Sequence, residues 1–178
     1  MSCDLKLCIK YKRYKIMKLC YCQDKCCSVL IKPYTLDKHK RRVINKKAGV
    51  FIYDPVQQKV LIIQSKGNLW GLPKGTFEKN ENSVECAIRE TYEETSIQLS
   101  HHHLGKCFCI RDQATYYFVQ LSMQNVEIQN SIDNDVNGIG WINVDCLQKL
   151  IQSGKVKINY HAKLCFNFFL GKNLTYKR

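Results

Sequence analysis

Three glutamates near the middle of the chain, Glu90, Glu93 and Glu94, stand at positions i, i+3 and i+4. A helix would place them on one side, where the like charges weaken it by roughly 0.2–0.5 kcal/mol per pair. A bound divalent cation would remove that cost. Mg2+ and Mn2+ suit carboxylate and carbonyl oxygens and leave positions for water and substrate phosphates. We therefore expect these carboxylates to hold Mg2+ or Mn2+ against a phosphate chain.

The segment around the glutamates has the pattern of an amphipathic helix. One stripe of side chains recurs at three- and four-residue spacing and can face a core: Val84, Ala87, Ile88, Thr91 and Thr95. Ser83 is the expected N-cap. Arg89 stands beside the glutamates and can orient one of them through a charge-assisted hydrogen bond.

The stretch from residue 70 to residue 97 resembles the sequence box of the Nudix hydrolases. That box reads Gly, five residues, Glu, seven residues, then Arg-Glu-aliphatic-x-Glu-Glu-x-Gly-aliphatic. The matching positions are Gly75, Glu81, Arg89, Glu90, Glu93, Glu94 and Ile97. Thr91 stands at an aliphatic position, and Ser96 replaces the last glycine, where a left-handed helix end is usual. Both departures concern packing and the helix exit, because every charged position matches.

The resemblance implies a reaction and a role for each of these residues. Nudix enzymes split a nucleoside diphosphate linked to another group, using metal ions to neutralise phosphate charge and to generate the attacking water. The implied metal ligands are Glu90, Glu93, Glu94 and the backbone carbonyl of Gly75. Arg89 would fix a glutamate, and Glu94 would also act as a base toward the water.

Within this family, the segment WGLPKG (70–75) is similar to the catalytic domain of the mRNA decapping enzyme. Its Pro-Lys-Gly part is shared with diadenosine tetraphosphate hydrolases. Decapping enzymes take a further acid from the loop before a late Trp-containing strand, and here Asp135 stands at that place. Asp133 is the alternative acid, and a solvated turn acid without a catalytic role is the other interpretation.

The decapping resemblance implies cleavage of the RNA cap, which releases 7-methyl-GDP and 5′-monophosphate RNA. The alternative is the same chemistry on dinucleoside polyphosphates, nucleoside triphosphates or diphosphoinositol phosphates. A catalytically silent RNA-binding Nudix module is a third hypothesis, which the intact acidic positions disfavour.

Positive charge is concentrated at the two ends of the chain, which has a formal net charge of +13. Residues 1–47 contain 14 Lys and Arg against 3 acids, residues 48–154 contain 8 against 12, and the last 24 residues add 6 basic groups and no acid. This split favours a polyanionic partner, nucleic acid first, over charge that serves solubility alone. The expected RNA contacts are Lys10, Lys12, Arg13, Lys15 and Lys74. Tyrosines interleaved with the first four can stack on bases, or can instead pack on the body of the protein.

The chain has room for one catalytic domain and an extension. We expect a basic, Cys- and Tyr-rich extension at residues 1–43 and a Nudix domain at residues 44–178. Alternating and apolar runs predict strands at 48–54, 59–65, 106–111, 115–123 and 139–142, helices at 144–152 and 161–171, and a loop at 101–103. With the box helix, these elements give the α/β/α sandwich around a mixed central sheet that the resemblance implies.

Eleven cysteines are present, six of them in the first 43 residues. The first residues lack the apolar core of a signal peptide, so we expect a cytoplasmic protein with reduced thiols. No stretch approaches the ~18 apolar residues of a membrane span, so no membrane partner is expected. Cys22, Cys26 and Cys27 lie close together in sequence, but they lack paired CxxC units and a nearby His. Zinc binding at these cysteines is therefore the minor interpretation.

Overall fold

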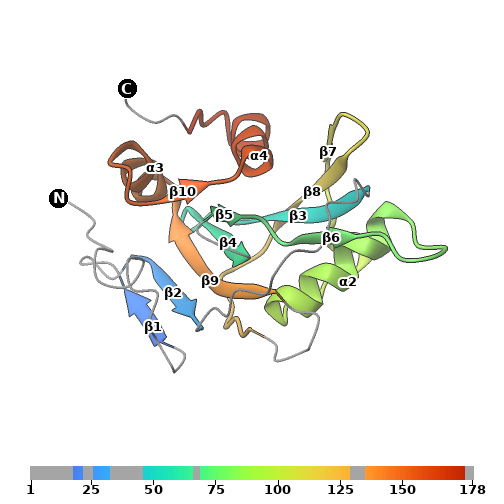
Figure 1. Cartoon of the computed structure of the whole chain (residues 1–178), viewed down its shortest axis with the longest axis horizontal. Helices are drawn as coiled ribbons and strands as arrows, with labels where there is room; N and C mark the ends of the chain where they lie inside the picture. Colours follow the sequence, from blue (N-terminus) through green and yellow to red (C-terminus); the bar gives the residue numbers. More distant parts are fainter. Residues whose placement is uncertain (1–17, 22–25, 33–45, 66–68, 129–134, 175–178) are drawn as a thin grey trace, which may run out of the picture.

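The computed structural model describes residues 18–21, 26–32, 46–65, 69–128 and 135–174 (Figure 1). Ten strands of these residues form one mixed sheet, with seven of them in the order β1-β2-β9-β4-β3-β8-β7. The strands are β1 (Lys18–Tyr21), β2 (Ser28–Ile31), β3 (Lys47–Asp54), β4 (Lys59–Ser65), β5 (Leu69–Gly71), β6 (Lys74–Thr76), β7 (Cys107–Ile110), β8 (Ala114–Gln120), β9 (Val136–Asn143) and β10 (Lys157–Ile158). The helices are α2 (Ser83–Thr95), α3 (Val144–Gln152) and α4 (Tyr160–Leu170), with a short 3-10 helix, η1 (His101–His103).

The antiparallel hairpin of β3 and β4 lies at the centre of the sheet, as the two apolar runs predicted. Asp54 forms its turn, because its Oδ1 accepts hydrogen bonds from the backbone N–H groups of Val56 at 2.9 Å and Gln57 at 3.0 Å. On the outer sides of the hairpin, β3 runs parallel to β8 and β4 runs antiparallel to β9. Both strands therefore have neighbours on two sides, which explains why their apolar runs are nearly continuous.

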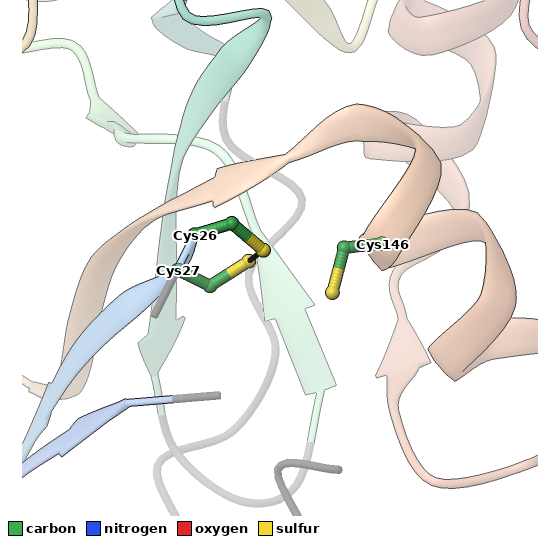
Figure 2. Close-up of side chains that lie close together, drawn as sticks. All are labelled: Cys26, Cys27 and Cys146. Atoms are coloured by element: carbon green, nitrogen blue, oxygen red, sulfur yellow. Dashed lines mark hydrogen bonds between the residues drawn. The ribbon is translucent and has the colours of Figure 1, made fainter. Parts of the chain in front are cut away.

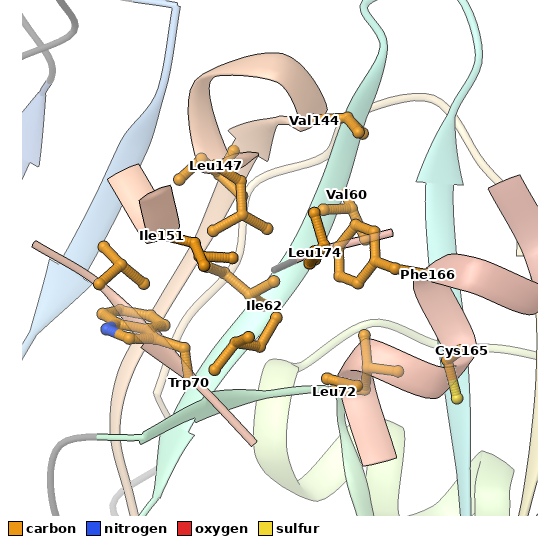
Figure 3. Close-up of a cluster of buried hydrophobic side chains, with 14 of the residues drawn as sticks. Val60, Ile62, Trp70, Leu72, Val144, Leu147, Ile151, Cys165, Phe166 and Leu174 are labelled. Atoms are coloured by element: carbon orange, nitrogen blue, oxygen red, sulfur yellow. The ribbon is translucent and has the colours of Figure 1, made fainter. Parts of the chain in front are cut away.

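Successive residues of the central strands pack into two cores on opposite faces of the sheet. On β4, Val60 lies in the core that α3 and α4 cover, whereas Leu61 lies in the core that α2 covers. Figure 3 shows the first core, where Leu147 of α3 and Phe166 of α4 converge with Val60. Burial of each such side chain contributes about 1.5–3 kcal/mol. The α/β/α sandwich predicted from the resemblance is confirmed.

Several element boundaries differ from the sequence-based prediction. The strand predicted at 139–142 extends over Val136–Asn143, because β2 and β4 both hydrogen-bond along it. The three histidines predicted in a loop form η1 and are exposed. No helix within the described ranges is long and apolar enough to cross a membrane.

Two strands from the first 43 residues join the sheet. β2 pairs antiparallel with β9, from Ser28 opposite Trp141 to Ile31 opposite Gly138, and β1 pairs with β2. Val29 of β2 is buried in the core beneath α3 and α4. The segment around β2 is therefore packed into the same body as the rest of the sheet.

Helix α2 begins with Asn82 as its N-cap, so the prediction of Ser83 is wrong by one residue. The Asn82 Oδ1 accepts hydrogen bonds from two backbone N–H groups of the first turn, at 2.9 and 3.0 Å. The Glu85 carboxylate accepts one in return from the backbone N–H of Asn82, which completes a capping box. Ser83 does not cap, because its hydroxyl lies 2.6 Å from the hydroxyl of Tyr117 on β8.

Ser96 ends α2 in the left-handed conformation, with φ 63°. An L side chain at this φ costs about 1–2 kcal/mol that glycine avoids, while glycine loses about 0.5–1 kcal/mol of chain entropy. Ser96→Gly is therefore expected to raise the free energy of unfolding by about 0.5–1 kcal/mol, measured by chemical denaturation. Ser153 is the matched control, because it ends α3 at φ −81° and Ser153→Gly should lower that free energy. A loss of stability in both variants would contradict the assignment of strain to Ser96.

Candidate active site

The strands β5 and β6 carry the chain from the central hairpin to α2. β6 pairs antiparallel with β3, with Gly75 opposite Ala48. Gly75 packs so closely against the Glu90 side chain of α2 that a Cβ at residue 75 would fall on the Glu90 carboxyl group. Glycine is required here because β6 lies directly against the helix. The residue predicted to offer its carbonyl to a metal is thus next to a predicted carboxylate ligand.

Arg89 is held by a two-pronged ion pair with Glu81, in which Nε lies 2.8 Å from Oε1 and Nη2 lies 2.9 Å from Oε2. Its Nη1 also donates to Glu90 at 3.0 Å and to Glu93 at 3.2 Å. A fourth partner is the backbone carbonyl of Thr76 on β6, which accepts a hydrogen bond from Nη2 at 3.1 Å. Arg89 therefore gathers three glutamates, and its closest partner, Glu81, matched the sequence box but had no specific role assigned from the sequence.

Glu94 is the buried carboxyl group of the site, with 7% of the residue exposed. Its Oε2 accepts a hydrogen bond from the backbone N–H of Lys74 at 2.7 Å. Burial raises the pKa of Glu94 to about 8, and the charges of Glu90 and Asp135 act in the same direction against that of Lys74. Burial also raises the pKa of Glu90. In the chain alone, Glu94 therefore holds a proton that a carboxyl group in water would release at neutral pH.

The donor set fits a hard divalent cation. Of the residues predicted as ligands, Gly75 and Glu90 meet where β6 packs against α2, Glu93 is linked to Glu90 through Arg89, and Glu94 accepts a hydrogen bond from the backbone N–H of Lys74 on β6. All four would offer oxygen atoms to a cation. A buried carboxylate that binds a cation is expected to have a raised pKa when the cation is absent, because a nearby positive ion favours the ionised form. Glu94 has such a raised pKa. The roles of these residues as ligands remain predictions.

Asp135 lies immediately before β9, close enough to Glu94 for its charge to raise the pKa of that group. Its charge also acts on Lys32 and Lys47, raising their pKa values against the lowering caused by burial. The structure thus brings Asp135 into the electrostatic neighbourhood of the box, and its catalytic role stays a prediction. The alternative, Asp133, lies outside the described residues.

Lys47 and His161 adjoin the site although sequence reasoning did not select them. Burial lowers the pKa of Lys47, and the charge of Lys74 acts in the same direction. Burial also lowers the pKa of His161, followed by the charges of Lys74 and Lys47. The His161 Nδ1 lies 3.5 Å from the hydroxyl of the buried Tyr116. No local motif marks these residues, because they reach the site through strand pairing and the packing of α4.

The predicted RNA contacts are divided between described and undescribed parts of the chain. Lys74 lies on β6, and its charge acts on Glu90 and Glu94. Lys10, Lys12, Arg13 and Lys15 lie outside the described residues, so their contact with RNA stays a prediction.

The Glu81–Arg89 pair predicts a specific pH dependence of stability. The hydrogen bond from Arg89 lowers the pKa of Glu81 to about 2, from an ordinary value of 4.5. Its contribution to stability is therefore complete above about pH 4.5 and is lost as the pH falls toward 2. Glu81→Gln should remove this contribution, at most about 3 kcal/mol at pH 7.

The measurement is the free energy of unfolding between pH 7 and pH 2.5. In the variant it should fall less steeply below about pH 4.5 than in the original chain. Glu78→Gln is the matched control, because the Glu78 side chain is 68% exposed and lies 3.8 Å from Arg89. Identical slopes in the original chain and Glu81→Gln would show that the pair does not stabilise the fold.

Comparison with known proteins identifies the family of the chain. The family model of the NUDIX domain matches residues 44–162. Protein 111R of Invertebrate iridescent virus 3, named provisionally as a hydrolase, is 34% identical over 141 residues, 74% of this chain and 81% of its own. The mRNA-decapping protein g5R of African swine fever virus is 28% identical over 137 residues, which cover 66% of this chain and 55% of g5R.

A solved structure shares the fold. The bifunctional NMN adenylyltransferase/ADP ribose pyrophosphatase of Francisella tularensis, complexed with AMP and a manganese ion, has a TM-score of 0.52 at 20% identity. The match covers 75% of this chain and 43% of that chain. The matched family segment contains the candidate site from Lys47 to His161. The chain therefore belongs to the Nudix family and is a hydrolase that acts on phosphoanhydride bonds.

Proposed function

We propose that this Nudix hydrolase removes the cap of messenger RNA, releasing 7-methyl-GDP and 5′-monophosphate RNA, with Mg2+ or Mn2+ as its metal. The observation that carries the proposal is the placement of Lys47 and Lys74 beside the carboxylates of Glu90 and Glu94. Such a site offers positive side chains to a phosphate chain next to the predicted metal ligands. The similarity to an mRNA-decapping protein supports the choice of capped RNA among phosphoanhydride substrates.

The mechanism assigns separate tasks to the residues of the site. Bound divalent cations would neutralise phosphate charge and lower the pKa of the attacking water. Glu94 is the proposed base, because a bound cation would keep its buried carboxylate ionised and so able to accept a proton from the water. Lys47 and Lys74 stabilise negative charge that develops on the phosphates. Arg89, itself fixed by Glu81, keeps Glu90 and Glu93 in position.

The proposed RNA grip is the basic N-terminal part of the chain. Without Lys47, which belongs to the reacting centre, residues 1–46 hold 13 basic groups against 3 acids, so this part of the chain has a net charge of +10. Each lysine or arginine that neutralises a phosphate releases a counterion, which strengthens binding at low salt. We propose that these basic side chains bind the body of the RNA and that the carboxylate site binds the cap.

Glu93→Gln and Glu94→Gln test the assigned site. Each change removes a negative charge at constant volume, so release of 7-methyl-GDP from cap-labelled RNA should fall by roughly 100-fold or more, about 2.7 kcal/mol. Glu127→Gln is the matched control, since Glu127 is an exposed glutamate outside α2. Circular dichroism checks that the variants are folded. Near-normal rates for both site variants at saturating Mg2+ or Mn2+ would refute the site.

Neutralising the basic N-terminal cluster tests the RNA grip. Deleting residues 1–43 is unsuitable because it would remove β2 and the buried Val29 from the core. We instead choose glutamine at Lys10, Lys12, Arg13 and Lys15 together. If all four contact phosphates, the slope of log affinity against log salt should flatten by roughly 3, at about 0.7 per contact. The KM for long capped RNA should rise, while hydrolysis of a cap dinucleotide stays unchanged.

A matched variant carries the same loss of charge at the other end of the chain. Glutamine at Lys155, Lys157, Lys163 and Lys172 removes four positive charges from the C-terminal part. This control should leave the salt slope nearly unchanged. An equal effect of both variants would show that the slope reports overall charge, and an unchanged slope in the first would exclude the N-terminal cluster as the RNA grip.

A further inference from the structure

Three cysteine side chains converge where the N-terminal hairpin meets α3 (Figure 2). Cys26 and Cys27 immediately precede β2, and Cys146 lies in the first turn of α3. The three Sγ atoms all lie within 4.8 Å of one another, and those of Cys26 and Cys27 are 3.4 Å apart. Cys27 is 1% exposed and Cys146 5%, while Cys26 is partly exposed. No His, Asp or Glu adds to this group within the part of the chain that the structure describes.

The separation of the sulfurs suits a metal–thiolate centre. Zn2+ binds sulfur ligands at about 2.3 Å in tetrahedral geometry, which keeps neighbouring sulfurs roughly 3.8 Å apart. The Sγ atoms of Cys26 and Cys27 are 3.4 Å apart, and each lies within 4.8 Å of the Cys146 Sγ. One ion between them could therefore reach all three with small side-chain adjustments. Soft thiolate ligands favour Zn2+ over the Mg2+ or Mn2+ proposed for the carboxylate site.

The surroundings of the sulfurs favour negative charge. The backbone N–H of Asn143 donates to the Cys27 Sγ at 3.4 Å. Cys146 lies in the first turn of α3, at the positive end of the helix dipole. Three thiolates in a largely buried place would nevertheless be costly without a cation. A bound Zn2+ would supply the missing positive charge.

Zinc binding at this site requires Cys146 to be reduced. Cys146 is disulfide-bonded in this structure, so the prediction of reduced thiols is wrong for this residue. Cys86, Cys107, Cys109 and Cys165 are thiols, as predicted. A phosphine reductant would break the Cys146 S–S bond into two thiols and become its oxide, with water supplying the oxygen and the two protons. Cys146 would then be able to bind a metal as a thiolate.

We propose that Cys26, Cys27 and Cys146 bind one Zn2+ in the reduced protein, with three thiol protons released to solvent. The ion fastens the β1–β2 hairpin to α3, on the face of the sheet opposite α2 (Figure 1). It is therefore separate from the carboxylate site, and its three protein ligands would leave a fourth position for water. Zinc is the minor interpretation from the sequence because neighbouring cysteines alone lack the usual ligand spacing. The third proposed ligand, Cys146, comes from α3, which is distant in the sequence.

The test begins with the zinc content of the full-length chain, reduced with a phosphine, dialysed and analysed by mass spectrometry for metals. We expect one zinc per chain. Cys26→Ser, Cys27→Ser and Cys146→Ser should each weaken zinc affinity at least tenfold. Cys109→Ser is the matched control, because Cys109 is an exposed thiol on β7, and it should keep full zinc content. Cys26→Ser is the variant least expected to disturb folding, since Cys26 is partly exposed.

Substitution by Co2+ separates the cysteine site from the carboxylate site. Cobalt on thiolates gives a sulfur-to-metal charge-transfer band, which cobalt on carboxylates lacks. The band should appear in the original chain and in Glu93→Gln, and it should be weakened in Cys26→Ser. The proposal is overturned if the reduced, folded chain binds no zinc and shows no such band. Zinc that stays in all three serine variants, or a Cys146 disulfide that persists under reduction, overturns it equally.

Discussion

The close contact between Gly75 on β6 and Glu90 on α2 sets how strand and helix lie against each other in the candidate active site. β6 is held by its pairing with β3 at the centre of the sheet, and α2 is held by Cys86 and Ala87 in the core below it. The carboxylates of α2 therefore face a backbone that cannot move away. Glycine at residue 75 is the condition for this arrangement, since any side chain would separate the strand from the helix.

The carboxyl groups of the candidate site have pKa values shifted in opposite directions. Burial near like charges raises the pKa of Glu94, whereas Arg89 lowers the pKa of Glu81. Glu81, which precedes the N-cap of α2, thus stabilises the fold, whereas burial opposes the ionisation of Glu94 on α2. Such a local conflict is expected where function, rather than stability, selects the residues. A divalent cation and a phosphate chain are the partners that would resolve it.

Local sequence patterns predicted the central hairpin, α2, α3 and the carboxylate set, because periodicity and fixed spacing within one segment encode them. The sequence predicts Ser83 rather than Asn82 as the N-cap of α2, because both residue types cap helices well. The pairing of β2 with β9 and the arrival of Cys146 beside Cys27 depend on contacts between distant segments. A single sequence holds no local signal for such contacts.

The most direct measurement of the central claim is product identification with three substrates offered side by side: cap-labelled RNA, free cap dinucleotide and diadenosine tetraphosphate. The substrates are incubated with the 178-residue chain and Mg2+ or Mn2+, and the products are resolved by chromatography. The account predicts that capped RNA is cleaved with the highest kcat/KM and gives 7-methyl-GDP and 5′-monophosphate RNA. Preferred hydrolysis of diadenosine tetraphosphate, with capped RNA left intact, would contradict it.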